Sequence, residues 1–98
     1  MMYFLTTIEE KDGEIEDRRC VGYFETYEEA ANIVLHNFYD INETIYNYAV
    51  IENIEEGIYQ YDQNSQWFEL YTDVEGNPRY RKIEKPEWAC GYCGFGIG

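Results

Sequence analysis

The thiols and the imidazole are the residues whose chemistry is easiest to name. Cys90 and Cys93 form a Cys-x-x-Cys motif, which can give two thiolates to a tetrahedral zinc ion. Two further ligands would have to come from Cys20 and His36, the remaining cysteine and the single histidine of the chain. The spacing of these four residues is irregular for a zinc site. We therefore expect structural or exposed, reduced thiols, with no metal and no cofactor.

The sequence also lacks the residue patterns of redox, histidine-based and calcium-binding sites. A redox Cys-x-x-Cys needs a thiolate at the start of a helix, and the glycine-rich residues Gly94–Gly98 after the motif predict none. A catalytic histidine needs a nucleophile and an orienting carboxylate, and the sequence groups neither with His36. The acidic turns, such as the one that contains Asp12, do not follow the spacing of a calcium loop. We expect a protein that is not an enzyme.

The charge of the chain is its strongest compositional feature. Twenty Asp and Glu stand against seven Lys and Arg, which gives a net charge of −13 over 98 residues. Nucleic acid and anionic membranes repel such a chain. Its natural partner is a basic surface, often on a protein that itself binds nucleic acid, and the alternative is that the charge only keeps the protein soluble. Aromatic residues make up 18% of the chain, which argues against disorder.

Nine of the carboxylates lie within the first 29 residues. If a first hairpin and the start of a helix are neighbours, these acids form one patch that imitates the charge of a phosphate backbone. Tyrosine adds a rigid contact with a polar tip, which suits binding interfaces. The residues that we expect to bind a partner are Glu9, Glu10, Asp12, Glu14, Glu16, Asp17, Glu25, Glu28, Glu29, Tyr23, Tyr46 and Tyr48.

One stretch, Thr26–Tyr39, has the periodicity of an amphipathic helix. Its apolar positions recur every 3.6 residues. They are Tyr27, Ala30, Ala31, Val34, Leu35 and Phe38. Thr26 is a suitable N-cap, and Glu29 completes a capping box.

Five strands are predicted around this helix, and they are residues 2–8, Arg18–Glu25, Tyr46–Ile54, Gln66–Thr72 and Arg79–Glu84. Asp12-Gly13 predicts a tight turn between the first two strands. In the second strand, Cys20, Gly22 and Phe24 should face one side, with Val21 and Tyr23 on the other. The third strand is apolar on both faces at its centre, which predicts a central position. Residues 58–61 are a further short extended piece.

The order β-β-α-β-β-β predicts an α+β fold, with a mostly antiparallel sheet of about five strands and one amphipathic helix packed on one face. The opposite face should display tyrosines and charged side chains to a partner. The length indicates a single domain, residues 1–98, with a glycine-rich tail at Glu87–Gly98. No apolar run is long enough to span a membrane, and the N-terminus lacks the features of a signal peptide, so we expect a cytoplasmic protein.

Three segments, Tyr48–Tyr59, Phe95–Gly98 and Thr26–Ala30, resemble those of small proteins from Firmicutes and their phages and mobile elements. In size, acidity and lack of a catalytic motif, the chain is also similar to phage-encoded anti-CRISPR proteins, many of which occupy basic nucleic-acid channels of Cas9-type effectors. The resemblance implies a non-enzymatic inhibitor of a type II Cas9, or of its guide-RNA loading, in the host bacterial cell. The alternatives are a zinc-binding or regulatory module built on Cys90 and Cys93, and a scaffold domain that dimerises through a sheet edge.

Overall fold

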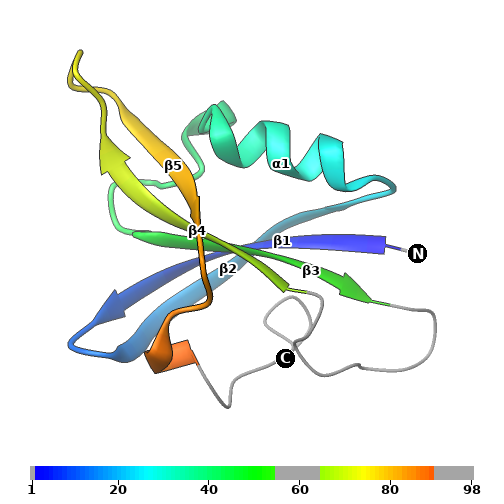
Figure 1. Cartoon of the computed structure of the whole chain (residues 1–98), viewed down its shortest axis with the longest axis horizontal. Coiled ribbons are helices and arrows are strands. Elements are labelled where there is room, and N and C mark those ends of the chain that lie inside the picture. Colours follow the sequence, from blue (N-terminus) through cyan, green and yellow to red (C-terminus); the bar gives the residue numbers. More distant parts are fainter. Residues whose placement is uncertain (1, 55–64, 90–98) are drawn as a thin grey trace.

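The computed structural model describes residues 2–54 and 65–89. These residues form one antiparallel sheet with a helix across one of its faces (Figure 1). The strands follow the order β2-β1-β3-β4-β5 and are β1 (Met2–Lys11), β2 (Glu14–Phe24), β3 (Tyr48–Ile54), β4 (Ser65–Thr72) and β5 (Pro78–Ile83). The helix is α1 (Tyr27–Leu35), and two short 3-10 turns are η1 (Phe38–Asp40) and η3 (Glu87–Ala89).

The predicted α+β class and the order of the helix and the five strands are confirmed. β3 occupies the middle of the sheet, as its two apolar faces predicted. The extended piece predicted at residues 58–61 lies outside the described residues. No helix in the described part of the chain is long and apolar enough to cross a membrane.

The hairpin of β1 and β2 turns at Asp12-Gly13, as the sequence predicted. Both residues have a positive φ, 53° at Asp12 and 83° at Gly13, which is the geometry of a two-residue turn that follows the twist of the strands. The amide N–H of Gly13 also donates to Oε2 of Glu10 at 2.6 Å. The turn is therefore specified both by its residue types and by a carboxylate of the preceding strand.

Two register shifts make β2 irregular. Leu5 pairs with Gly22 and the next residue, Thr6, pairs with Cys20, so Val21 is an extra residue on β2. Val21 and Phe24 consequently both pack against the core under the helix. The predicted placement of these two side chains on opposite sides is wrong, because a β-bulge changes the alternation of the strand.

The helix begins as predicted but ends earlier. Thr26 has extended backbone angles, its Oγ1 accepts from the amide N–H of Glu29 at 3.3 Å, and its hydroxyl donates to Oε1 of Glu29 at 3.2 Å. α1 stops at Leu35 rather than Tyr39, because Asn37 adopts a left-handed conformation with φ 48° just past the last turn. The amide N–H of Asn37 donates to the carbonyl of Val34 at 3.0 Å, which closes the helix.

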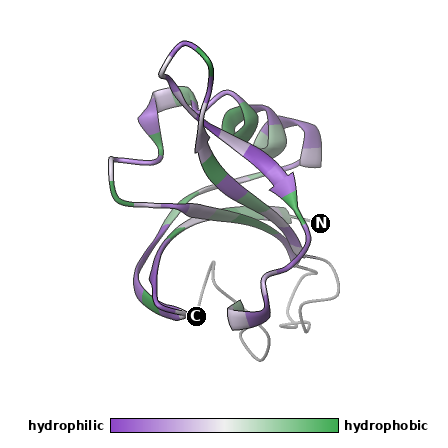
Figure 2. Ribbon diagram, turned by 60° about the vertical axis from the view of Figure 1, so that its left-hand side comes forward, coloured by the Kyte–Doolittle hydropathy of each residue, from purple (hydrophilic) through white to green (hydrophobic). Residues whose placement is uncertain are grey.

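The main core lies between α1 and the sheet. Its buried side chains come from the helix, from the loop that follows it and from every strand except β2, with β2 contributing at its border. They are Leu5, Ala30, Ala31, Val34, Ile41, Ala49, Ile51, Phe68 and Tyr80. Figure 2 shows the hydrophobic positions of the helix and the alternation of hydrophobic and hydrophilic positions along the curved sheet. This alternation is what allows a sheet to bury one face against a helix.

A second, smaller core covers the opposite face of the sheet. Ile8, Val50 and Trp67 are buried there beneath η3, together with Ala89. Trp88 packs edge-on against Trp67, with ring centroids 5.5 Å apart. The expectation that this face displays tyrosines and charges to a partner is therefore wrong over the strand centres. The apolar residues on the second face of β1, β3 and β4 are covered by the chain itself.

Candidate partner-binding surface

The turn half of the β1–β2 hairpin is the most acidic part of the described structure. We call residues Glu9–Asp17 the acidic hairpin end. It contains six carboxylates and one basic residue, Lys11, for a net charge of −5. The side chains of Asp12, Glu14, Glu16 and Asp17 are exposed, and the side chains of Glu9 and Glu10 are half-buried. The hairpin therefore brings together six of the nine acids that the sequence assigned to partner binding.

Two of these acids also hold the hairpin in place. Asn47, just before β3, accepts from the amide N–H of Glu10 at 2.8 Å and donates to its carbonyl at 3.0 Å. Asp17 accepts from the hydroxyl of Tyr46 at 3.0 Å. Glu10 and Asp17 are therefore bound to the segment that leads into β3, and the remaining exposed acids project from a fixed frame.

Tyr46 is a structural residue rather than a contact residue. Only 5% of its surface is exposed, and its carbonyl accepts from the buried hydroxyl of Tyr80 at 2.7 Å. Burial raises the pKa of Tyr46, and the hydrogen bond and negative charge of Asp17 raise it further. Burial also raises the pKa of Tyr80. Tyr46 is thus buried rather than displayed on the surface, which tyrosine composition could not predict, because composition does not tell a buried phenol from an exposed one.

The two other tyrosines differ in their exposure. Tyr48 is half-buried, and its ring packs edge-on against Trp88 with centroids 5.0 Å apart, so most of it belongs to the second core. Tyr23 is exposed and lies beside Phe4 on the hairpin, with ring centroids 5.9 Å apart. Tyr23 is available to a partner, but it pairs with Phe4 far from the turn of the hairpin.

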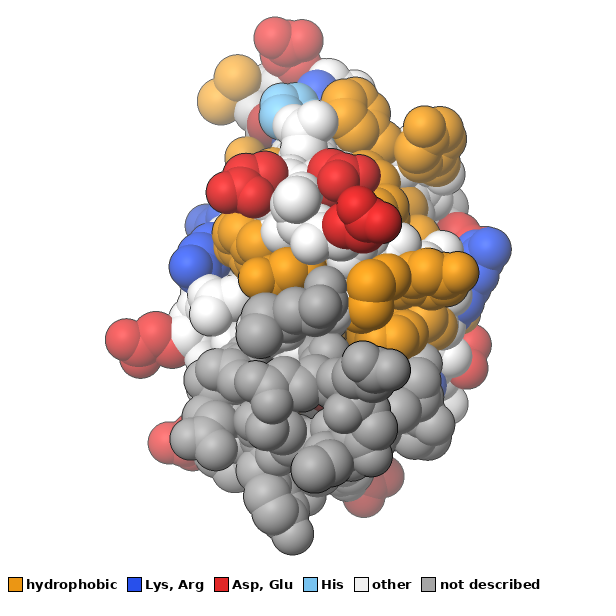
Figure 3. All heavy atoms as spheres, turned by 90° about the vertical axis from the view of Figure 1, so that its right-hand side faces the viewer, with side chains coloured by type: hydrophobic (Ala, Val, Ile, Leu, Met, Phe, Trp, Pro, Cys, Tyr) orange, Lys and Arg blue, Asp and Glu red, His pale blue; other side chains and the backbone are white. Residues whose placement is uncertain are grey.

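The three acids at the start of the helix do not join the hairpin acids. Glu25, Glu28 and Glu29 are exposed next to Phe24, which pairs with Tyr3 at the opposite end of the hairpin from the Asp12-Gly13 turn. Tyr3 lies six positions before Glu9, or about 20 Å along an extended strand. Figure 3 shows acidic side chains on this end of the molecule among hydrophobic ones. The predicted single patch is therefore two separate acidic groups.

The thiol and imidazole candidates are not grouped in the part of the chain that is described. Cys20 is an exposed free thiol on β2. His36 follows α1, where its ring stacks on Phe38 at a centroid distance of 5.2 Å. Across residues 2–54 and 65–89, no three His, Cys, Asp or Glu side chains gather in a way that could hold a metal ion. Cys90 and Cys93 lie outside the described residues.

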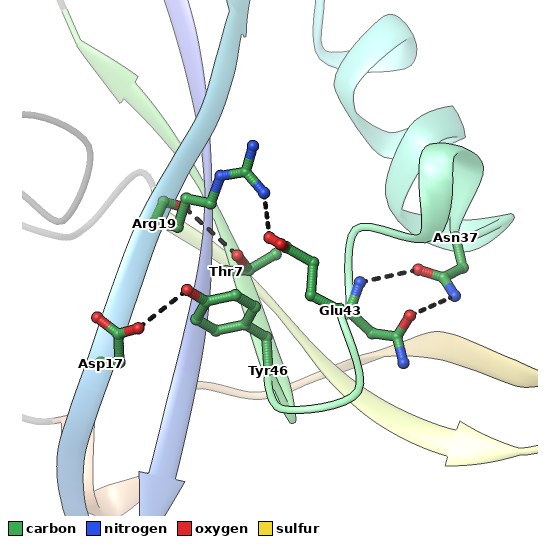
Figure 4. Close-up of polar contacts among 7 residues, drawn as sticks. Thr7, Asp17, Arg19, Asn37, Glu43 and Tyr46 are labelled. Carbon is green, nitrogen blue, oxygen red and sulfur yellow. Dashed lines mark hydrogen bonds and ion pairs between the residues drawn. The ribbon is translucent and has the colours of Figure 1, made fainter.

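The sequence did not predict a further feature, the aromatic loop, which we define as residues 36–46 between α1 and β3. Side-chain contacts fasten it to the hairpin (Figure 4) and also to β5. Arg19 forms an ion pair with Glu43, and Nη1 of Arg79 donates to the carbonyl of His36 at 3.1 Å. Phe38 and Tyr39 stay exposed. The sequence signal for this loop was Asn37, which favours the left-handed end of a helix, although the apolar stripe continues past it to Phe38.

Comparison with known proteins adds no relative from which a function could be transferred. No protein-family model matches the chain. Neither a search of curated proteins nor a search of solved structures gives a significant match. The function therefore has to be inferred from the arrangement of the acids, the aromatic loop and the two cores.

Proposed function

We propose that this protein is a non-enzymatic inhibitor that binds a basic, nucleic-acid-binding surface of another protein through its acidic hairpin end. The leading target is a type II Cas9 before or during guide-RNA loading. The choice of a defence nuclease rests on the similarity in size and acidity to anti-CRISPR proteins. The choice of the hairpin rests on the concentration of carboxylates at its turn.

The observation that supports this proposal most directly is the charge density of the acidic hairpin end. Its successive residue pairs are Glu9 with Asp17, Glu10 with Ile15, and Lys11 with Glu14. These pairs and the turn span about 10 Å at about 3.4 Å per residue. Duplex DNA carries about six phosphate charges over about 10 Å of its axis. Six carboxylates in this length give a partner a charge density similar to that of its nucleic acid.

The rest of the sheet favours the same orientation. β2 and β5 form the two edges of the sheet. Three of the seven basic residues lie on β5, at Arg79, Arg81 and Lys82, and two of them pair with the acids Asp73 and Glu69. A basic surface therefore attracts the acidic hairpin end more strongly than the β5 edge, so the charge distribution orients the approach of the protein.

The first test compares two variants with the same change in charge. The hairpin variant replaces Asp12→Asn, Glu14→Gln and Glu16→Gln, which leaves Glu10 and Asp17 to hold the fold. The control replaces Glu25→Gln, Glu28→Gln and Glu75→Gln, away from the hairpin turn. At about 0.2–1 kcal/mol for each exposed ion pair, we expect the hairpin variant to bind guide-free Cas9 about tenfold more weakly. The control should bind like the wild type.

The same proteins should be added to a Cas9 cleavage reaction before and after guide loading. Inhibition only before loading supports competition with RNA for a basic channel, and it should weaken as salt rises. Inhibition at both stages points to the target-DNA channel of the nuclease. Equal activity of the hairpin variant and the wild type contradicts binding through these acids, and wild-type protein without effect at either stage rejects Cas9 as the target.

A further inference from the structure

The aromatic loop has an unusual backbone. Five residues without the freedom of glycine have a positive φ within eight positions, and they are Asn37, Tyr39, Asp40, Glu43 and Thr44. Asn and Asp tolerate this conformation, but it is unfavourable for an aromatic residue and most unfavourable for a β-branched one. Such backbone conformations persist only when the surroundings impose them, and they concentrate at binding and switch sites.

Buried polar contacts hold the loop in this conformation. Nδ2 of Asn37 donates to Oδ1 of Asn42 at 3.0 Å and to the carbonyl of Pro78 at 3.4 Å. In return, the amide N–H of Asn42 donates to Oδ1 of Asn37 at 3.2 Å. Ile41 lies between them in the chain and is buried in the main core. The loop is therefore anchored from inside, which fixes the direction in which its outer residues point.

The anchored loop displays apolar side chains to solvent. Tyr39 is 89% exposed, and Phe38 and Ile45 are 43% and 44% exposed. Phe38 stacks on His36 and lies 6.4 Å from the ring of Tyr39, so the aromatic rings form one exposed group. A regular helix through Tyr39, as the sequence predicted, would have kept Phe38 on the apolar stripe toward the sheet. The left-handed backbone at Asn37 and Tyr39 instead leaves both Phe38 and Tyr39 exposed.

The loop adjoins the acidic hairpin end. Tyr46 donates to Asp17, and Glu43 pairs with Arg19 in the same strand, so the second half of the loop is joined to β2 (Figure 4). Asp40, next to Tyr39 in the chain, and Glu43, the partner of Arg19, are two more exposed carboxylates of the same loop. A surface that joins exposed aromatic residues to acids matches a basic protein surface with an apolar recess, because aromatic anchors in a polar rim dominate many interfaces.

We propose that the aromatic loop is the anchor of the same interface, with Tyr39 and Phe38 entering an apolar recess that is bordered by basic residues of the partner. This inference rests on the proposed function. The hairpin acids govern the approach and its salt dependence, and the aromatic rings govern how long the complex lasts. The strained backbone prepares the rings for binding, so little conformational freedom is lost on association.

The test uses Tyr39→Asn, which removes the ring and keeps a residue that tolerates a positive φ. The control is Tyr71→Asn, which removes an exposed tyrosine on β4. Both variants are compared with the wild type and with the hairpin variant. Surface plasmon resonance measures their rates of binding to, and dissociation from, immobilised guide-free Cas9 at several salt concentrations. We expect Tyr39→Asn to dissociate at least about tenfold faster with an unchanged salt slope, and to retain the melting temperature of the wild type. Tyr71→Asn should bind like the wild type.

The outcomes separate the two proposals. A Tyr39→Asn variant that binds like the wild type, beside a weakened hairpin variant, overturns the anchor and leaves the proposed function standing. Wild-type protein that does not bind Cas9 overturns both. The loop could instead join two copies of the chain. In that case the wild type is a dimer, Tyr39→Asn is a monomer, and both bind Cas9 equally. This result also overturns the anchor.

Discussion

At the scale of single residues, the backbone of the aromatic loop explains why particular side chains stand where they do. Thr44 has φ 63° and Tyr39 has φ 61°, although neither residue favours the left-handed region. The Asn37–Asn42 pair compensates for this with buried hydrogen bonds. Local preference and final structure thus disagree at the loop, which is the pattern expected where a conformation serves something other than stability.

Thr44 provides a direct test of this strain. We expect Thr44→Gly to raise the free energy of unfolding by about 0.5–1 kcal/mol, because glycine relieves a left-handed β-branched residue by about 1–2 kcal/mol and loses part of this through its freer unfolded chain. Chemical denaturation measures the change. Thr44→Ala is the control, since it removes the side chain but keeps the Cβ that causes the strain. A gain in stability with alanine as well would place the effect in the side chain and not in the backbone.

At the scale of elements, the side chain of Asn47 extends the pairing of β1 with β3. It makes the backbone hydrogen bonds that a longer β3 would otherwise make. β1 and β3 pair from Met2 with Ile54 to Ile8 with Tyr48. Past that point the amide group of Asn47 bonds both the N–H and the carbonyl of Glu10. This contact fixes the acidic hairpin end to the segment that leads into the central strand of the sheet.

We expect Asn47→Ala to destabilise the protein by about 1–3 kcal/mol, because two backbone groups of Glu10 lose their partner. Amide hydrogen exchange should show faster exchange at Glu10 than in the centre of β1. Asn77→Ala is the control, because the hydrogen bonds of Asn77 in the β4–β5 turn are made by its backbone N–H and carbonyl. Unchanged exchange at Glu10 in Asn47→Ala would show that the hairpin end is held by its own pairing alone.

Local signals predicted some elements and not others. Asp12-Gly13 and Thr26 each determine a turn or a cap through their own chemistry, so the hairpin turn and the start of α1 were predictable. The bulge at Val21 and the end of α1 before Asn37 depend on contacts with distant segments, and the apolar periodicity runs through both without a break. The aromatic loop was missed for this reason, because Phe38 fits the helical stripe perfectly well in sequence.

At the scale of the whole molecule, burial distinguishes the tyrosines that stabilise the fold from those that are free to bind. Tyr27, Tyr46, Tyr48 and Tyr80 all have a raised pKa, with burial as the largest cause in each case. Their neutral form is therefore favoured in the folded state. The net charge of −13 adds electrostatic repulsion between copies of the chain.

The raised pKa values determine how stability changes with pH. Below the ordinary tyrosine value of 10.0 the phenols are neutral in both states, and their contribution is complete. Above this value the unfolded chain loses protons that the folded chain retains, so stability falls as pH rises. Denaturation at several alkaline pH values, with phenolate absorbance to follow ionisation, should show this fall. Tyr80→Phe should give a shallower slope, and parallel curves for the two proteins would contradict a buried, protonated Tyr80.

The packing of Trp88 on Trp67 gives the molecule an internal optical signal. These are the two tryptophans of the chain, and their rings meet at 89° within the second core. Indole emission therefore reports whether η3 is seated on the sheet, while the core beneath α1 has no indole and remains silent. A ligand that binds at the aromatic loop should leave this emission unchanged, whereas detachment of η3 should shift it to longer wavelength even when the helix and the sheet stay intact.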